Sequence, residues 1–208
     1  MNKQQFIQAA GITSALGDKW FPHIIETMNK FGIDTPKRQA HFIAQIGTES
    51  GGFRSVQESL NYSVAGLSIF GARLTPAQRE QLGRQPGEAA LSPKRQEAIA
   101  NLVYGGRYGN DLGGDGWKYR GRGLKQITFR DNYAACGKAL GLNLLDNPGL
   151  LTDDRYAALS AGWFWQSNGC NAFADADDVA GLTRRINGGT NGLDDRKQRT
   201  RIAEAALC

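Results

Sequence analysis

The pattern of apolar positions predicts a chain made almost entirely of helices. Residues 18–30, for example, place Phe21, Ile24, Ile25 and Met28 at helical spacing. Three later Thr-Pro or Ser-Pro pairs combine an N-cap hydroxyl with proline at the first helical position, and each predicts a helix start. We expect helices over residues 2–10, 18–30, 36–50, 63–70, 76–83, 93–103, 131–140, 154–166, 177–186 and 194–206.

The stretch 104–123, YGGRYGNDLGGDGWKYRGRG, interrupts the helical pattern. Its glycines exclude a long helix, and they let the backbone approach another group closely. We expect a loop or a short β-hairpin near Trp117. The predicted fold class is therefore mainly α, with at most a small β-hairpin.

The chain divides into two regions of different polarity. Residues 71–106 are more polar than their flanks and contain two of the short, charged helices. We interpret them as a small helical lobe inserted into a main lobe that residues 1–70 and 107–208 form. A length of 208 residues suits one domain or two small lobes.

The charge balance favours an acidic partner. The formal net charge is +5 and the isoelectric point is about 9.2, which suits nucleic acid, an anionic membrane surface or an acidic polymer. The basic residues form no long tract, and no nucleic-acid motif is present. We expect no nucleic-acid partner. The N-terminal residues are too polar for a secretory signal peptide, and no apolar run could span a bilayer, which predicts a cytoplasmic protein.

The cysteines and histidines give no sign of a disulfide framework or a metal site. Cys136, Cys170 and Cys208 are far apart and odd in number, and only His23 and His41 are present. We therefore expect three buried thiols and no His-rich metal site.

Glu49 stands out in the run HFIAQIGTESGGF, residues 41–53. It lies near the end of a helix with a strong apolar stripe, immediately before a pair of glycines at 51 and 52. The carbonyl groups at a helix C-terminus carry partial negative charge, and this disfavours ionisation of a carboxyl group there. We expect the pKa of Glu49 to be raised, as a general acid needs.

Glu58 follows nine positions later, past the glycine turn. Two carboxyl groups on either side of a sharp turn can face each other across a groove. Hydrolysis of a glycoside with inversion needs such a pair, roughly 6.5–9.5 Å apart. Spacing alone leaves open that Glu49 and Glu58 are two unrelated surface groups.

Several short sequence motifs, in this order, favour a functional pair of glutamates over two unrelated surface groups. They are HFIAQIGTESGGF, ESLNYS, VYGGRYGN, GDGWKYRGRGLKQIT, NYAACGKALGLNLLDNPGLL, AGWFW and TRRINGGTNGLDDR. Together, over about residues 36–201, the chain resembles the family 19 glycoside hydrolases, a chitinase-like group, and is most similar to the endolysins of phages and prophages. The resemblance implies a lysozyme-like, two-lobed helical fold with a cleft, an inverting mechanism, and no metal or cofactor.

The resemblance also implies roles for individual residues. Glu49 would be the general acid, Glu58 the base that activates water, and Thr128 a hydroxyl that holds this water. An arginine beside Glu58 would keep that carboxylate ionised. The substrate-binding candidates, from the resemblance or from their ability to stack on sugars, are Gln126, Asn132, Asn187, Arg196, Tyr62, Trp117 and His41.

Structural roles stay open for most of the substrate-binding candidates. Trp117 could cover the hairpin, Arg196 could be a solvated cation, and His41 could be a hydrogen-bonding group within the helix. Gln126 and Asn132 could satisfy backbone groups, and Asn187 could end a helix.

The implied function is that of an endolysin that cuts β-1,4 bonds between N-acetylated sugars of peptidoglycan. We expect a monomer without stable membrane insertion, which waits in the host cytoplasm until it is released to the wall. Residues 71–106 are candidates for wall contact. The alternatives are a bacterial chitinase with the same chemistry, a non-catalytic wall-binding module, and a toxin delivered to a rival cell. Unlike plant chitinases, the chain lacks paired cysteines and a signal peptide, which favours peptidoglycan over chitin.

Overall fold

The computed structural model describes all 208 residues and is almost entirely helical. The prediction of a mainly α fold is confirmed, since only three isolated β-bridges occur. The helices are α1 (Lys3–Ala10), α2 (Ser14–Lys30), α3 (Pro36–Glu49), η1 (Gly66–Arg73), α4 (Pro76–Leu82), α5 (Pro93–Tyr104), α6 (Asp115–Lys118), α7 (Arg130–Leu140), η2 (Pro148–Thr152), α8 (Asp154–Ser167), α9 (Cys170–Asp175), α10 (Val179–Asn187) and α11 (Leu193–Leu207). None of them is both long and apolar enough to cross a membrane.

The Thr-Pro and Ser-Pro pairs start helices as predicted. The hydroxyl groups of Thr35, Thr75 and Ser92 each accept a hydrogen bond from the backbone N–H three residues later, and proline occupies the first turn. These caps fix the starts of α3, α4 and α5. The start of α3 matters most, because this helix carries Glu49 at its other end.

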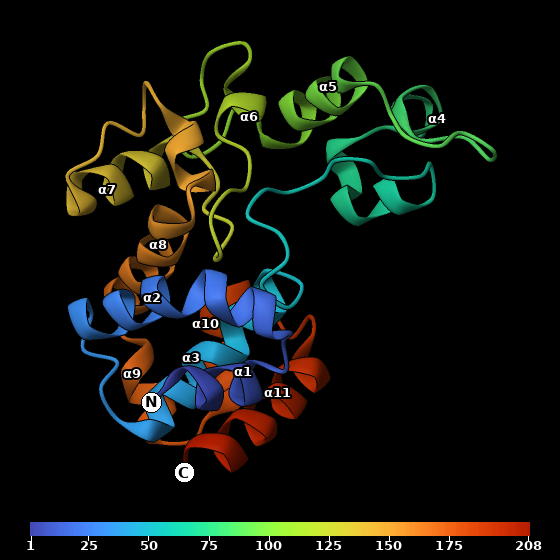
Figure 1. Cartoon of the computed structure of the whole chain (residues 1–208). Coiled ribbons are helices and arrows are strands. Elements are labelled where there is room, and N and C mark those ends of the chain that lie inside the picture. Colours follow the sequence, from blue (N-terminus) through green and yellow to red (C-terminus); the bar gives the residue numbers. More distant parts are fainter.

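One half of the molecule is built around α3. Figure 1 shows α1, α2, α3, α9, α10 and α11 gathered in its lower part, with both termini. The largest apolar core, of 24 buried residues, lies among these helices and α8. Trp20 and Trp165 are its largest members, and the ring of Phe42 meets Trp165 edge-on at 5.3 Å between centroids. This core holds α3 rigidly.

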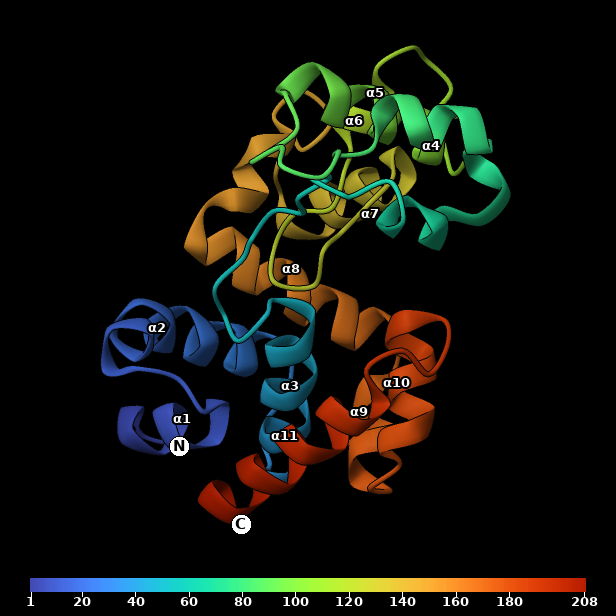
Figure 2. The same cartoon turned by 90° about the vertical axis from the view of Figure 1, so that its right-hand side faces the viewer.

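The other half has two smaller cores. One contains Leu60, Leu67, Leu74, Leu91, Ile99, Ala100 and Val103, and the other lies among α7, η2 and the loop before α7. In Figure 2, α4, α5, α6 and α7 lie above α8, on the opposite side from α1 to α3. Leu60 and Leu67 precede residue 71, so the packing around α4 and α5 continues beyond residues 71–106. The division into an inserted and a main lobe stays a prediction.

Some local expectations differ from the structure. Trp117 lies in the four-residue helix α6, not in a hairpin, and the nearest antiparallel bridge joins Arg122 to Ile127. α6, α9 and η2 were not predicted, because elements of four to six residues are too short to show a helical period. α2 begins at Ser14 because the Thr13 hydroxyl caps it.

The cysteines are free thiols in different environments. Burial raises the pKa of both Cys136 and Cys170 to about 12, so these two thiols are inert at neutral pH. Cys208 is exposed, so the expectation of a third buried thiol is wrong.

Candidate active site

Glu49 is the last residue of α3, and the turn that follows keeps it at the edge of the core. The Ser50 hydroxyl donates to the carbonyl of Ile46 and accepts from the N–H of Phe53. Gly51, Gly52 and Phe53 all have positive φ, which reverses the chain within three residues. The Glu49 side chain is only 11% exposed. Its carboxylate is therefore held in place at the border of solvent.

Two cations contact the Glu49 carboxylate. The guanidinium of Arg196, on α11, donates to Oε1 of Glu49 and to the amide oxygen of Gln45. The Nζ of Lys125 lies 3.1 Å from the other oxygen, Oε2. Arg196 is 2% exposed, so it is not a solvated cation. No arginine forms an ion pair with Glu58, because α11 packs along α3 and brings Arg196 to Glu49; Arg120 acts on Glu58 only through its charge.

Glu58 has neutral partners instead. The hydroxyl of Tyr104 donates to its Oε2 at 2.7 Å, and the N–H of Gly121 donates to its Oε1 at 2.5 Å. The backbone N–H of Glu58 in turn donates to the carbonyl of Gly121. Burial and the nearby Glu58 charge raise the pKa of Tyr104 above its usual value, so its phenol remains a donor. No local pattern in the sequence marked Tyr104 as a partner of Glu58.

One loop contacts both glutamates. In Figure 1 it is the yellow-green segment between α6 and α7 that descends toward α3. Gly121 meets Glu58 at one end of this segment, and Lys125 reaches Glu49. The N–H groups of Gly123 and Leu124 donate to backbone carbonyls of the chain before Glu58 and of α8. The loop is thus fixed from both sides, and it sets the positions of the two carboxylates.

A side chain larger than glycine would crowd the loop where it meets Glu58. A Cβ at position 121 would lie 2.9 Å from the amide oxygen of Gln126 and 3.4 Å from the Glu58 carboxylate. Glycine there permits the direct backbone contact with Glu58. This contact is the close approach of the backbone to another group that the glycine-rich sequence predicted.

A cavity of about 300 Å³ lies beside this loop. Three predicted residues line it: Gln126, Thr128 and Asn132. Their side chains also hydrogen-bond local backbone: Gln126 donates to Gly123, Thr128 to Gln126, and Asn132 to Thr128, at 2.8–3.0 Å. These three residues can therefore stabilise the local backbone and also bind a substrate in the cavity. Ile186, the neighbour of the exposed Asn187 at the end of α10, lines the same cavity.

Tyr62 and Trp117 lie on the side of the site that contains Glu58. Tyr62 is partly buried, and burial together with the charge of Glu58 raises its pKa. The Arg120 guanidinium lies 3.6 Å from the centre of the Trp117 ring, and Trp117 packs against the core around Leu60. One face of this indole is covered, so only the remaining part could stack on a sugar.

His41 does not belong to a substrate-binding surface. It is completely buried, and its imidazole contacts Asp177 and Glu204. The prediction of a substrate contact is wrong for this residue. Its place on the same helix as Glu49 gave that prediction, but eight residues separate the two.

Changing Tyr104 to phenylalanine tests the contact with Glu58. The ring would keep its edge-on packing against Phe70 and Phe129, so the fold should persist. The loss of a hydrogen bond to a charged group, about 1.5–3 kcal/mol, should lower kcat by about tenfold or more. The measurement is the turnover of a glycan that the wild-type protein cleaves. Unchanged kcat with unchanged thermal stability would mean that the Tyr104 hydroxyl does not support Glu58.

Comparison with known proteins places this chain in a family. The family described as chitinase class I matches residues 97–184. A glycosyl hydrolase family 19 domain-containing protein of Haemophilus influenzae is 39% identical over 195 residues, which cover 89% of this chain and 92% of that protein. The chain belongs to glycoside hydrolase family 19.

Other relatives of this family 19 protein are chitinases. Chitinase C from Streptomyces griseus HUT6037 shares its fold with a TM-score of 0.61 and 21% identity, over 99% of this chain and 76% of the other. Basic endochitinase B of Arabidopsis thaliana is 37% identical over 94 residues, which are 36% of this chain and 28% of the plant protein. The sequence-based assignment to family 19 is confirmed. None of these three relatives is named an endolysin, so that narrower assignment stays a proposal.

Proposed function

We propose that this family 19 protein hydrolyses β-1,4 bonds between N-acetylated sugars of bacterial peptidoglycan, with inversion. Glu49 is the general acid and Glu58 the base in this proposal. It rests chiefly on one observation: two carboxylates from separate segments contact a single fixed loop that lines a cavity. An acid and a base held on one frame are what an inverting glycosidase requires.

The contacts of Glu58 suit a base. Tyr104 and Gly121 both donate to it, and both complement a negative charge. In the proposed reaction Glu58 takes a proton from a water molecule, and the water oxygen attacks the anomeric carbon from the face opposite the leaving group.

Glu49 must carry a proton when it acts on the leaving oxygen, yet Arg196 and Lys125 contact it in the unliganded protein. Lys125 also lines the cavity, so a glycan chain that enters there would displace its ammonium group from Glu49. Arg196 is buried and bound to Gln45, so it would stay and orient the carboxyl group. We propose that substrate entry thus prepares Glu49 for its role as an acid.

Thr128 tests the water-holding step. Its hydroxyl donates to the carbonyl of Gln126, and it can accept one further hydrogen bond from a water. Thr128→Ala should lower kcat by about tenfold, less than loss of either glutamate, because other groups can also hold water. Thr128→Ser keeps the hydroxyl and should retain most activity. Equal activity in the alanine and serine variants would remove Thr128 from the mechanism.

The choice of peptidoglycan over chitin rests on charge. A protein with a net charge of +5 is attracted to an anionic wall, and salt weakens this attraction. Chitin is the second candidate, because the Arabidopsis and Streptomyces relatives are named as chitinases. Cleavage of walls should fall as ionic strength rises, whereas cleavage of uncharged chitin oligomers should not.

The decisive experiment uses both polymers. Purified protein and its Glu49→Gln variant are incubated with purified peptidoglycan and, separately, with soluble chitin oligomers. Mass spectrometry identifies the new reducing ends. Muramic acid ends from peptidoglycan would establish a muramidase, and glucosamine-type ends from the wall a glucosaminidase. Cleavage of chitin alone would establish a chitinase, and no new ends from either polymer would favour a binding module.

The biological role in this proposal is lysis of a host cell from within. The protein would accumulate in the cytoplasm as a monomer and reach the wall after the membrane is opened. Expression in a bacterial cytoplasm should leave cell density unchanged until a membrane-permeabilising agent is added, and lysis should then follow. Cells with the Glu49→Gln variant should not lyse. Wild-type lysis no faster than that of this variant would contradict the role.

A further inference from the structure

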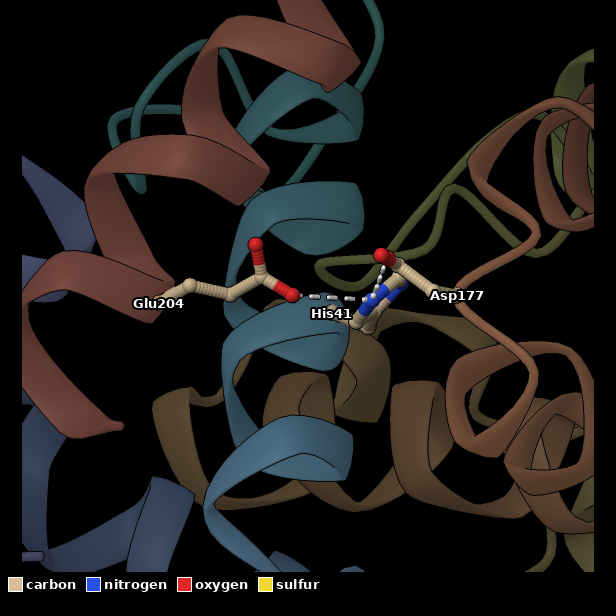
Figure 3. Close-up of side chains that lie close together, drawn as sticks. All are labelled: His41, Asp177 and Glu204. Carbon is tan, nitrogen blue, oxygen red and sulfur yellow. Dashed lines mark hydrogen bonds and ion pairs between the residues drawn. The ribbon is translucent and has the colours of Figure 1, made fainter.

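A second cluster of polar groups surrounds His41, which lies on α3 two helical turns before Glu49. Figure 3 shows the imidazole of His41 between the carboxylates of Asp177 and Glu204. The Nε2 atom lies 3.1 Å from Oδ1 of Asp177 and 3.5 Å from Oε1 of Glu204. All three potential ligand atoms lie within 4.8 Å of one another. They come from α3, from the loop between α9 and α10, and from α11.

This arrangement has the dimensions of a metal site. One imidazole nitrogen and two carboxylate oxygens are common ligands of Zn²⁺. A tetrahedral ion with bonds of about 2.0–2.1 Å holds neighbouring ligand atoms roughly 3.3 Å apart. The two distances from His41 lie on either side of this value, and the two carboxylate oxygens lie within 4.8 Å of each other, so an ion would draw the carboxylates closer together.

The charge of the cluster also suits a cation. Neither Asp177 nor Glu204 forms an ion pair with a lysine or arginine; His41 is the partner of both. This differs from Glu49, whose two oxygens each contact a basic side chain. With a neutral imidazole the cluster carries two negative charges beside a buried ring, and a divalent ion would neutralise them. Lys197 and Arg201 line the same cavity, but neither forms an ion pair with these carboxylates.

The cluster is open to solvent on one side. Asp177 and Glu204 line a cavity of about 350 Å³, together with residues of α10 and α11. Asp177 is exposed and Glu204 is partly exposed, whereas His41 is completely buried. The cavity offers an entry path for an ion and room for a water molecule at a fourth coordination position.

We propose that His41, Asp177 and Glu204 bind a divalent transition metal ion, for which Zn²⁺ is the best fit. The composition, with two histidines, predicted no metal site. The ligands come from three distant segments, so no spacing motif marks them, and the fold alone brings them together.

The ion would stabilise the frame that carries Glu49. Two polar contacts join α3 to α11: Glu49 pairs with Arg196, and His41 pairs with Glu204. His41 lies eight residues before Glu49 on α3, whereas Glu204 lies eight residues after Arg196 on α11. α3 and α11 therefore run antiparallel, and polar contacts join them at two levels roughly 12 Å apart along the helix axis. The site is structural and does not depend on the proposed glycosidase activity.

The affinity should be moderate. Metal-binding histidines usually donate their second N–H to an acceptor, and loss of such a partner weakens binding by about 10–100-fold. The Nδ1 atom of His41 is buried without a partner. We therefore expect a micromolar Kd for Zn²⁺.

The test is calorimetric titration of the full chain with zinc chloride after treatment with a chelator. The Cys208→Ser background removes an exposed thiol that could bind zinc by itself. We expect one ion per chain, and a melting temperature raised by about 5 °C or more at a hundred times the Kd. Titration with Co²⁺ should give the intense visible absorption of a tetrahedral site.

Two variants locate the ion. Asp177→Asn keeps a residue type that tolerates the positive φ of 56° at this position, and Glu204→Gln keeps the length of the side chain. Each should weaken binding at least tenfold and abolish the thermal shift. Asp194→Asn, which changes an exposed carboxylate on the same helix α11, is the matched control and should bind as the parent does. No binding up to millimolar zinc, or undiminished binding in both variants, would overturn the proposal.

Discussion

Replacing Glu49 with glutamine is expected to abolish cleavage of the glycan while the protein still folds and binds it. The amide has nearly the shape of the carboxyl group but cannot give a proton to the leaving oxygen. Loss of a general acid typically costs about 10²–10⁴-fold in rate. The measurement is the release of reducing ends, with glycan binding followed separately by co-sedimentation with the insoluble polymer.

The environment of Glu49 makes a stability control necessary. Arg196 is 2% exposed, and the substitution leaves its buried charge without a carboxylate partner, although the glutamine oxygen and Gln45 can still accept from it. Breaking a buried ion pair can cost about 3–5 kcal/mol, so the melting temperature should fall. The matched control is Glu97→Gln, on the exposed surface of α5. Full activity in a folded Glu49→Gln protein would remove this residue as the acid.

The position of Glu49 could be predicted because each signal that sets it is local. Thr35 and the following proline start α3, the apolar stripe fixes the buried face, and Gly51 and Gly52 end it. The partners of Glu49 could not be predicted in the same way. Arg196 is 147 residues away in the sequence and Lys125 is 76 away. Pairings across such distances depend on how helices pack, and no local pattern records them.

Glu58 and His41 also have partners that no local sequence pattern predicts. The sequence placed Glu58 beyond the glycine turn, but its partner Tyr104 lies at the end of a helix in the other half of the molecule. His41 and Gln45 are four residues apart on one helix face. Both do meet α11, but Gln45 binds Arg196 there whereas His41 faces Glu204. The two residues on one face of α3 thus contact the same helix, α11, but different side chains on it.

Replacing Glu58 is expected to be as damaging as replacing Glu49, for a different reason. The amide of Glu58→Gln cannot take a proton from water, which should lower kcat by about 10²–10⁴-fold. Its NH₂ group would also face a donor, either the Tyr104 hydroxyl or the Gly121 N–H, where the carboxylate accepts from both. Glu58→Asp keeps the charge but withdraws it by one methylene, so it should retain more activity than Glu58→Gln. Near wild-type turnover in Glu58→Gln would show that the scheme with two carboxylates is wrong.

Azide distinguishes a base from a merely structural carboxylate at position 58. In Glu58→Ala the missing side chain leaves space near the anomeric carbon, and azide is a nucleophile that needs no deprotonation. It would attack this carbon while Glu49 protonates the leaving oxygen, and the product would be a glycosyl azide of inverted configuration. We expect azide to restore cleavage in Glu58→Ala but not in Glu49→Gln, because the second variant lacks the acid and not the base. Restored cleavage in neither variant, with both proteins folded, would mean that Glu58 acts by holding the Gly121 loop and not by activating water.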